Sequence, residues 1–284
     1  MTAQDAIRAR AKELLESGEV ATFIGWEAGR FENQTTPLVI TDAADADKLV
    51  FNEYCVNTLA KYARDVMARG KVGLVVRGCD SRGIVRLIAD KVIDRDAVYL
   101  IGVGCPGMKD RKTGEELKKC VECRRNNPVL CDEMAGEEVD KPVAADRFAE
   151  VRAVEEMPQP ERSRYFESVY AKCIRCYACR DVCPCCTCRE CFVDQRRENW
   201  VGKQNNVAEN RFYGLTRVMH IGDRCIECGE CERVCPMDLP LMKLNRKVIQ
   251  DMNDLFGEFE SSMSLEDTSE PLIEYRLDDV EEFM

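Results

Sequence analysis

The sequence is poor in residues for acid–base chemistry and in long apolar runs. His220 is the only histidine among 284 residues, and no G-x-S-x-G or Walker A motif is present. The run G-V-G-C-P-G at 102–107 is glycine-rich but does not open an evident helix, so it is a weak sign of dinucleotide binding. No apolar run approaches the length of a transmembrane helix, and residues 1–18 lack the apolar core of a signal peptide. We therefore expect a cytoplasmic chain that is not an integral membrane protein and has little catalytic machinery of its own.

Negative charge and cysteine are present in excess. The formal net charge of −11 argues against a nucleic-acid partner. Eighteen cysteines in a chain without a secretion signal indicate metal ligands in a reducing, anaerobic setting rather than a disulfide scaffold. The apolar fraction of 45% allows an ordinary globular core as well.

Two cysteine runs share the pattern C-x2-C-x2-C-x3-C-P, which is an iron–sulfur signature. In this pattern three close thiolates bind one cluster and the fourth binds the other, so eight cysteines predict two 4Fe-4S clusters. The long interval between the runs favours an all-helical ferredoxin-like module. The ligands expected for one cluster are Cys173, Cys176, Cys179 and Cys235, and for the other Cys225, Cys228, Cys231 and Cys183.

The N-terminal half has the pattern of an α/β domain. Buried-type strands are predicted at residues 72–76 and 97–103, with a sharp turn at 78–81 and a helix at 83–92 between them. Such a βαβ unit makes the two strands parallel. Further predictions are a helix at 3–17, strands at 20–24 and 35–40, and one or two helices at 43–68.

A third group of thiols follows the second of these strands. Ligands of open α/β sheets collect outside the carboxyl ends of the strands, and four cysteines lie in the loops beyond that edge. They predict a third 4Fe-4S cluster, with structural zinc or no metal as alternatives. The four are Cys105, Cys120, Cys123 and Cys131.

Six cysteines remain outside these groups. Cys186, Cys188 and Cys191 form a C-x-C-x2-C pattern, which with a fourth ligand from Cys55 or Cys79 predicts a further cluster or a zinc site. Adjacent Cys185 is not expected to join them, and free buried thiols are the alternative. Cys55 otherwise packs in a helical stretch, and His220 packs or hydrogen-bonds a cluster sulfur.

The predicted turn before the helix at 83–92 is a second kind of candidate site. A thiolate or a bound anion is stabilised at the N-terminus of a helix. The turn is therefore expected to hold a metal-binding thiolate or a flavin phosphate, between which the motif does not decide. Its residues are Gly78, Cys79, Asp80 and Ser81.

Four segments follow from these patterns. Residues 1–135 are expected to form the α/β domain with its cysteine-rich loops, 136–165 a linker with one short helix, and 166–257 the helical dicluster domain. Residues 258–284 form a strongly acidic tail, which is expected to be a solvated end or, alternatively, an arm that grips a partner subunit.

Two stretches carry resemblances to known families. The run C-I-E-C-G-E-C-E-R-V-C-P-M-D-L-P-L resembles the helical ferredoxin modules in the C subunits of heterodisulfide reductase and of the Rnf complex, which implies two 4Fe-4S clusters. The run K-V-G-L-V-V-R-G-C-D-S-R-G-I-V-R-L-I resembles the beta subunits of coenzyme F-420-reducing hydrogenase and formate dehydrogenase, which implies a 4Fe-4S cluster beside an FAD.

The leading hypothesis is an iron–sulfur electron-transfer subunit of a cytoplasmic anaerobic oxidoreductase complex. It would relay single electrons between a catalytic subunit, such as a hydrogenase or formate dehydrogenase, and a flavin-containing or heterodisulfide-reductase-like partner. One alternative is a flavoprotein subunit that itself reduces a deazaflavin or nicotinamide coenzyme. A second alternative is a zinc-binding scaffold protein.

Overall fold

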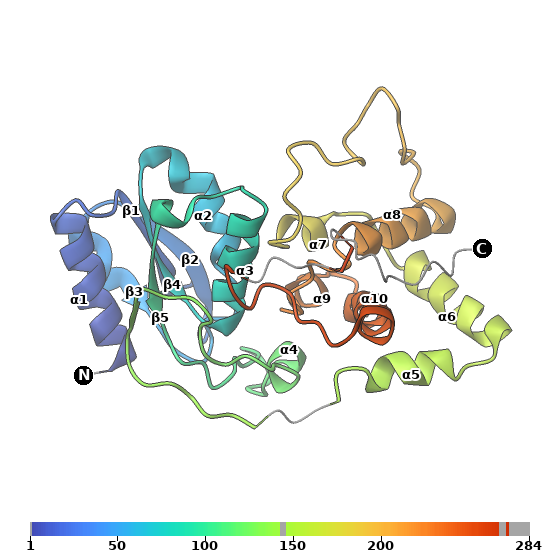
Figure 1. Cartoon of the computed structure of the whole chain (residues 1–284), viewed down its shortest axis with the longest axis horizontal. Coiled ribbons are helices and arrows are strands. Elements are labelled where there is room, and N and C mark those ends of the chain that lie inside the picture. The colour runs from blue at the N-terminus through green and yellow to red at the C-terminus, as the bar shows by residue number, and fades with distance from the viewer. Residues whose placement is uncertain (1, 143–145, 267–270, 273–284) are drawn as a thin grey trace.

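The computed structural model describes residues 2–142, 146–266 and 271–272 of the chain (Figure 1). The chain folds into an N-terminal α/β half and a C-terminal helical half. The α/β half is built on one sheet with parallel strands at its centre. These two halves agree with the fold class predicted from the sequence.

The sheet has the strand order β2-β1-β4-β5-β6, with β3 paired to β1. β1, β4, β5 and β6 run parallel, and β2 and β3 are antiparallel to β1. Every residue of β4 is buried, as expected for a parallel strand covered on both faces. The strands are β1 (Thr22–Ala28), β2 (Thr35–Ile40), β3 (Leu49–Val50), β4 (Val72–Val76), β5 (Val98–Gly102) and β6 (Glu133–Met134).

Helices cover both faces of this sheet (Figure 1). α1 (Ala3–Glu16) packs on one side, and its first turn is held by a capping box between Thr2 and Asp5. α2 (Ala60–Val66) and α3 (Gly78–Ala89) pack together on the other side. Short 3₁₀ turns at Ala43–Lys48, Met67–Arg69 and Arg95–Ala97 complete the connections.

The helical half surrounds the later cysteines. α7 and α9 are single turns within the two cysteine runs, whereas α8 and α10 are long helices that pack against each other. The helices are α4 (Lys118–Val121) in the loop after β5, then α5 (Ala149–Glu155), α6 (Gln159–Ala171), α7 (Ala178–Asp181), α8 (Val207–His220), α9 (Glu230–Arg233) and α10 (Leu241–Phe256).

Buried charges join the two halves. Lys119 pairs with Glu230, and their side chains are 7% and 0% exposed. Burial by itself would raise the pKa of Glu230, but Lys119 and Arg233 lower this pKa to about 2. Arg233 also donates to Asn57 of the α/β half at 2.8 Å. The two cysteine-bearing halves are therefore held in one fixed relation.

Several predicted boundaries were wrong. α3 begins at Gly78, so the predicted turn at 78–81 is the first turn of the helix. Between 43 and 68 the chain forms a 3₁₀ turn, β3 and only one short α-helix. The predicted linker contains α5 and most of α6, because apolar Val151 and Val154 are buried and hold it in place. The last twelve residues of the acidic tail lie outside the described residues.

Candidate iron–sulfur sites

The two four-cysteine runs follow the same backbone course. Arg175 and Tyr177 in the first run have φ angles of 50° and 60°. Glu227 and Gly229, at the equivalent positions of the second run, have φ angles of 54° and 68°. A left-handed conformation costs a non-glycine residue about 1–3 kcal/mol. The same costly conformation at equivalent positions indicates that both loops have the same function. In the first run this conformation brings the Arg175 N–H to 3.4 Å from the Cys173 thiol.

Site 1 is a cavity between the first run, α8 and the start of α10. Tyr213 Oη lies 3.5 Å from Cys179 Sγ, the kind of contact that tunes a cluster potential. Tyr170 Oη and Asn210 Oδ1 belong to the same wall and have no hydrogen-bond partner within the described chain. The wall of the cavity thus offers two buried polar atoms that could form hydrogen bonds to a bound group. Its thiols are Cys173, Cys176, Cys179 and Cys235.

Site 2 is a smaller and more deeply buried cavity beside α9. Asn245 Nδ2 donates to Cys231 Sγ at 3.7 Å, and burial raises the pKa of Cys231 to about 12. A thiol that burial keeps neutral, as at Cys231, loses its proton when a metal binds. Four of the thiols that line site 2 are Cys183, Cys225, Cys228 and Cys231, and Cys185 lines it as well. Sites 1 and 2 therefore have the swapped grouping that the motif predicts, while ligation itself stays a prediction.

Arg217 lies where the walls of sites 1 and 2 meet. The residue is 4% exposed, and its Nη2 donates to the Cys179 carbonyl at 3.0 Å. Its Nε has no partner among the described residues, and the charged groups that act on it most strongly are thiols such as Cys183. A buried guanidinium without an anion is costly. Because a cluster held by four thiolates is anionic, both sites fit such a group.

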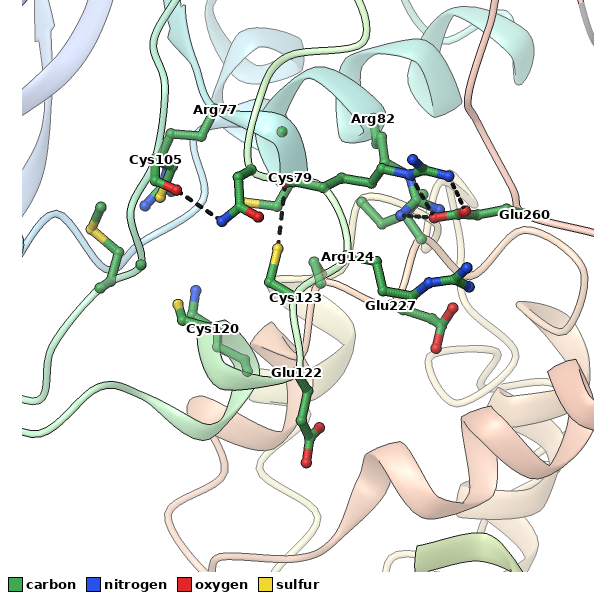
Figure 2. Close-up of a pocket in the computed structure, with 18 residues that line it drawn as sticks. Arg77, Cys79, Arg82, Cys105, Cys120, Glu122, Cys123, Arg124, Glu227 and Glu260 are labelled. Atoms are coloured by element: carbon green, nitrogen blue, oxygen red, sulfur yellow. Dashed lines mark hydrogen bonds and ion pairs between the residues drawn. The ribbon is translucent and has the colours of Figure 1, made fainter. Parts of the chain in front are cut away.

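Site 3 lies at the carboxyl edge of the sheet (Figure 2). Cys79 stands on the first turn of α3, directly after β4, and Cys105 follows β5. Cys120 and Cys123 come from α4 and the residues after it, and burial raises the pKa of Cys79, Cys105 and Cys123. Site 3 comprises the thiols of Cys79, Cys105, Cys120 and Cys123.

Positive charge and backbone contacts shape the wall of site 3. Arg77 and Lys119 line it, and both are buried. Asn126 donates from Nδ2 to the Cys105 carbonyl at 2.9 Å and holds the two loops together (Figure 2). The wall thus places cations beside thiols whose anionic form needs compensation.

The expected composition of this third group differs from the structure at one position. Cys131 does not line site 3, because it precedes β6 and packs against the core of the α/β half next to Gly102. Cys79 lines the cavity instead. The signal for this was available in the sequence, since Cys79 and Cys105 each follow a parallel strand.

The polar side chains in the first turn of α3 form hydrogen bonds with other parts of the protein. Asp80 accepts a hydrogen bond from the Leu59 N–H at 2.6 Å, and Ser81 Oγ accepts one from the Val129 N–H at 3.0 Å. A Cβ atom at Gly78 would lie 2.0 Å from the Arg125 carbonyl oxygen. Of the turn expected to hold a thiolate or a flavin phosphate, only the Gly78 and Cys79 end faces the cavity, and Asp80 and Ser81 are engaged inside the protein.

The remaining thiols line a cavity of their own, which we call the α8 cavity. It lies against the end of α8, and Figure 1 shows the long excursion between α7 and α8 that carries its cysteines. Neither Cys55 nor Cys79 lines it, because Cys55 is fully buried in the α/β core and Cys79 lines site 3. The thiols of the α8 cavity are Cys185, Cys186, Cys188 and Cys191.

The cavities are neighbours. Ile226 and Cys228 line both site 2 and site 3, and Arg217 lines both site 1 and site 2. Within the described chain, no three histidine, cysteine or carboxylate groups converge tightly enough to hold a single metal ion. The thiols line cavities and do not converge on the position of a single ion. This arrangement suits a multi-iron cluster better than zinc.

Comparisons with known proteins agree with this chemistry. Residues 169–239 match the family described as 4Fe-4S dicluster domain. Residues 169–239 therefore form a 4Fe-4S dicluster domain, which together with the two cysteine runs supports the binding of 4Fe-4S clusters. None of the described helices has the length and apolar character of a membrane span.

Three curated relatives are subunits of oxidoreductases. The F420-dependent formate dehydrogenase subunit beta of Methanocaldococcus jannaschii is 34% identical over 40% of this chain and 28% of its own length. The F420-dependent formate dehydrogenase 1 subunit beta of Methanococcus maripaludis is 23% identical over 86% of this chain and 87% of its own length. The C subunit of the ion-translocating oxidoreductase complex of Buchnera aphidicola is 36% identical over 31% of this chain and 16% of its own length.

A solved structure of the F420-reducing [NiFe] hydrogenase complex from Methanosarcina barkeri, derivatized with xenon, also matches. Its similar chain is 24% identical and has a TM-score of 0.30, with 37% of this chain and 39% of that chain covered. A structural likeness this low supports no conclusion about the present chain.

Proposed function

We propose that this chain, an iron–sulfur electron-transfer subunit related to the F420-dependent formate dehydrogenase beta subunits, holds a row of three 4Fe-4S clusters at sites 3, 2 and 1. The observation that supports the proposal is that neighbouring cavities have wall residues in common. Cys228 separates site 3 from site 2, and Arg217 separates site 2 from site 1. Such clusters, when bound, supply one-electron transfer at potentials set by their surroundings.

The proposed ligands follow the cavities. The thiolates of site 1 come from the first cysteine run and the end of the second, and those of site 2 from the second run and the end of the first. Site 3 takes its ligands from the start of α3, the loop after β5, and α4 with the residues that follow it. The proposed ligands are Cys173, Cys176, Cys179 and Cys235 for site 1, Cys183, Cys225, Cys228 and Cys231 for site 2, and Cys79, Cys105, Cys120 and Cys123 for site 3.

The rest of the protein positions and insulates these groups. Arg77, Lys119 and Arg217 bring buried positive charge to the cavity walls. Glu230 balances Lys119 and ties site 2 to site 3 through the interface between the halves. Apart from exposed His220, no histidine is available for proton transfer, which favours a relay over hydride chemistry.

The proposed partners are the other subunits of a redox complex. The names of the relatives point to a catalytic subunit of the formate dehydrogenase kind at one end of the row. At the other end we propose a flavin-containing or heterodisulfide-reductase-like subunit. The proposed units are the α/β domain at 1–135 and the dicluster domain at 166–257, each of which would face one partner.

A second candidate is a flavoprotein subunit that itself reduces a deazaflavin. Its support is the similarity to an F420-dependent enzyme subunit over most of the chain. The flavin would need a place beside site 3, where the first turn of α3 is already occupied by the protein's own groups.

Analysis of anaerobically purified protein separates the two. The relay predicts at least about twelve iron and twelve acid-labile sulfide per chain, four of each for every one of sites 1 to 3, without bound flavin. Stoichiometric FAD would overturn the pure relay in favour of the flavoprotein. Zinc without acid-labile sulfide would overturn both.

A further inference from the structure

The α8 cavity stands outside the proposed row, and nothing in a two-cluster ferredoxin module requires its four cysteines. Its volume is about 310 Å³, against about 50, 40 and 10 Å³ for sites 3, 1 and 2. It shares Tyr213 and Arg217 with site 1, and Cys185 and Ile221 with site 2. The α8 cavity therefore adjoins sites 1 and 2 without lying in the row that they form with site 3.

The wall of the α8 cavity carries more positive than negative charge. Six basic and three acidic side chains line it. Two of the three carboxylates, those of Asp181 and Asp194, are already paired with Arg180 at 2.9 and 2.7 Å. The basic residues are Lys61, Arg64, Arg180, Arg189, Arg217 and Arg224. Such a wall suits an anionic occupant.

Three of its thiols are available as ligands. Cys186, Cys188 and Cys191 line the cavity with the close spacing that iron–sulfur loops use. Cys185 is engaged elsewhere, since its thiol donates to the Arg224 carbonyl at 2.9 Å and it belongs to the buried apolar cluster with Cys183. Cys186 packs against the edge of the same cluster and is less buried than Cys185. Two adjacent cysteines also cannot easily reach one metal together.

His220 is the remaining donor on this wall. Its ring packs edge-on against Phe192 at 5.3 Å, and both residues line the cavity. No hydrogen bond of its ring is recorded among the described residues. Imidazole replaces thiolate at some iron–sulfur centres.

We propose that the α8 cavity binds a fourth 4Fe-4S cluster. Its thiolate ligands are Cys186, Cys188 and Cys191, and its fourth ligand is His220. A zinc ion is the less suitable occupant, because zinc needs its ligands close around one point, and no such group exists among the described residues. This inference goes beyond the three-cluster row and does not depend on it.

The first test counts clusters. Native mass spectrometry of the anaerobically purified chain should show four clusters, and a count of three with no metal elsewhere would overturn the proposal. Cys188→Ser/Cys191→Ser should lose about a quarter of the iron and sulfide, while the EPR signals of the other clusters persist. Unchanged iron, or the loss of one zinc in place of iron, would overturn it. Cys131→Ser is the control, because Cys131 lines none of these four cavities.

The second test addresses the fourth ligand. Pulsed EPR of the reduced protein should detect a nitrogen strongly coupled to one cluster, and His220→Ala should abolish this coupling without changing the other signals. A coupling that survives in His220→Ala would overturn the assignment of His220. If only three clusters were counted, sites 1 to 3 and the relay would stand while the proposal for the α8 cavity would fall.

Discussion

Arg217 is the residue on which the two dicluster sites depend together. Its buried guanidinium lies at the walls of sites 1 and 2 and is surrounded mainly by thiols. In the proposed row, an anionic cluster on each side would compensate this charge, and in return the charge would favour the reduced, more negative form of each cluster. The buried charge of Arg217 is thus expected to influence the reduction potentials of the clusters at sites 1 and 2.

Arg217→Met should make the reduction potentials of both clusters more negative. At ~8 Å and an effective dielectric constant of ~20, one charge contributes about 2 kcal/mol, which for one electron is about 90 mV. EPR-monitored redox titration measures the shift. Arg211→Met is the matched control, because it removes a charge from an exposed position of the same helix and should shift the potentials little. Equal shifts in the two variants would contradict the role of Arg217.

The buried pair of Arg77 and Asp80 is the corresponding structural feature of the α/β half. The side chains are 1% and 0% exposed, and Arg77 Nε lies 2.7 Å from Asp80 Oδ2. Asp80→Ala should lower the free energy of unfolding by about 3–5 kcal/mol, because it leaves a buried charge without its partner.

Anaerobic guanidinium unfolding in a Trp200→Phe background measures this loss. Trp26 is then the only tryptophan, and it packs against Arg77 in the sheet core. As the control, Asp45→Ala breaks an exposed pair with Lys48 and should cost less than about 1 kcal/mol. A loss of under about 1 kcal/mol for Asp80→Ala would contradict a stabilising role of this pair.

At the scale of elements, the start of α3 determines the shape of site 3. Gly78 lets the helix begin directly against the backbone of Arg125, and this contact places Cys79 at the cavity. No other residue fits at this position, since a Cβ atom there would lie 2.0 Å from a carbonyl oxygen.

Gly78→Ala should therefore displace the loop at 125–127 and reduce the iron bound at site 3. We expect a loss of more than about 2 kcal/mol in stability from this overpacking, together with the loss of about four iron atoms per chain. Gly202→Ala is the control, because its Cβ atom would meet only the flexible end of Glu209. Full iron content in Gly78→Ala would show that Cys79 is not a ligand.

The sequence predicted the elements that have strong local signals. The strands at 35–40 and 72–76 match the structure, since short runs rich in β-branched and apolar residues and bounded by polar or turn residues favour strands. The start of α3 was misplaced, because Gly-Cys-Asp-Ser has turn propensity that the tertiary contacts of Asp80 and Ser81 override.

The grouping of the thiols into sites was also predictable only where the signal is local in sequence. Sites 1 and 2 follow from motif spacing, because their ligands are local in sequence apart from one exchange. Site 3 draws on segments after two different strands, so the choice of Cys79 over Cys131 depends on the parallel pairing of those strands and not on motif spacing.

At the scale of the whole molecule, the two halves are stabilised differently. The α/β half has an extensive apolar core, whereas the apolar cluster around site 2 contains only four buried residues, two of them the cysteines Cys183 and Cys185. We therefore expect the helical half to depend on its clusters for stability.

Removing iron with a chelator should unfold part of the helical half and leave the sheet folded. Far-UV circular dichroism should lose helical signal, while Trp26 keeps the emission of a buried side chain in the Trp200→Phe background. Reconstitution with iron and sulfide should restore the helical signal. Loss of the Trp26 environment at the same step would contradict independent stability of the two halves.

The most direct test of the row is EPR of the reduced Cys183→Ala variant. If site 2 stands between sites 3 and 1, the reduced wild type should show spectra broadened by coupling between neighbouring clusters. Cys183→Ala should lose the cluster of the second cysteine run and, with it, the coupling of that cluster to the clusters of sites 1 and 3. Loss of only the cluster held by Cys173, Cys176 and Cys179, or coupling that persists unchanged, would contradict the account.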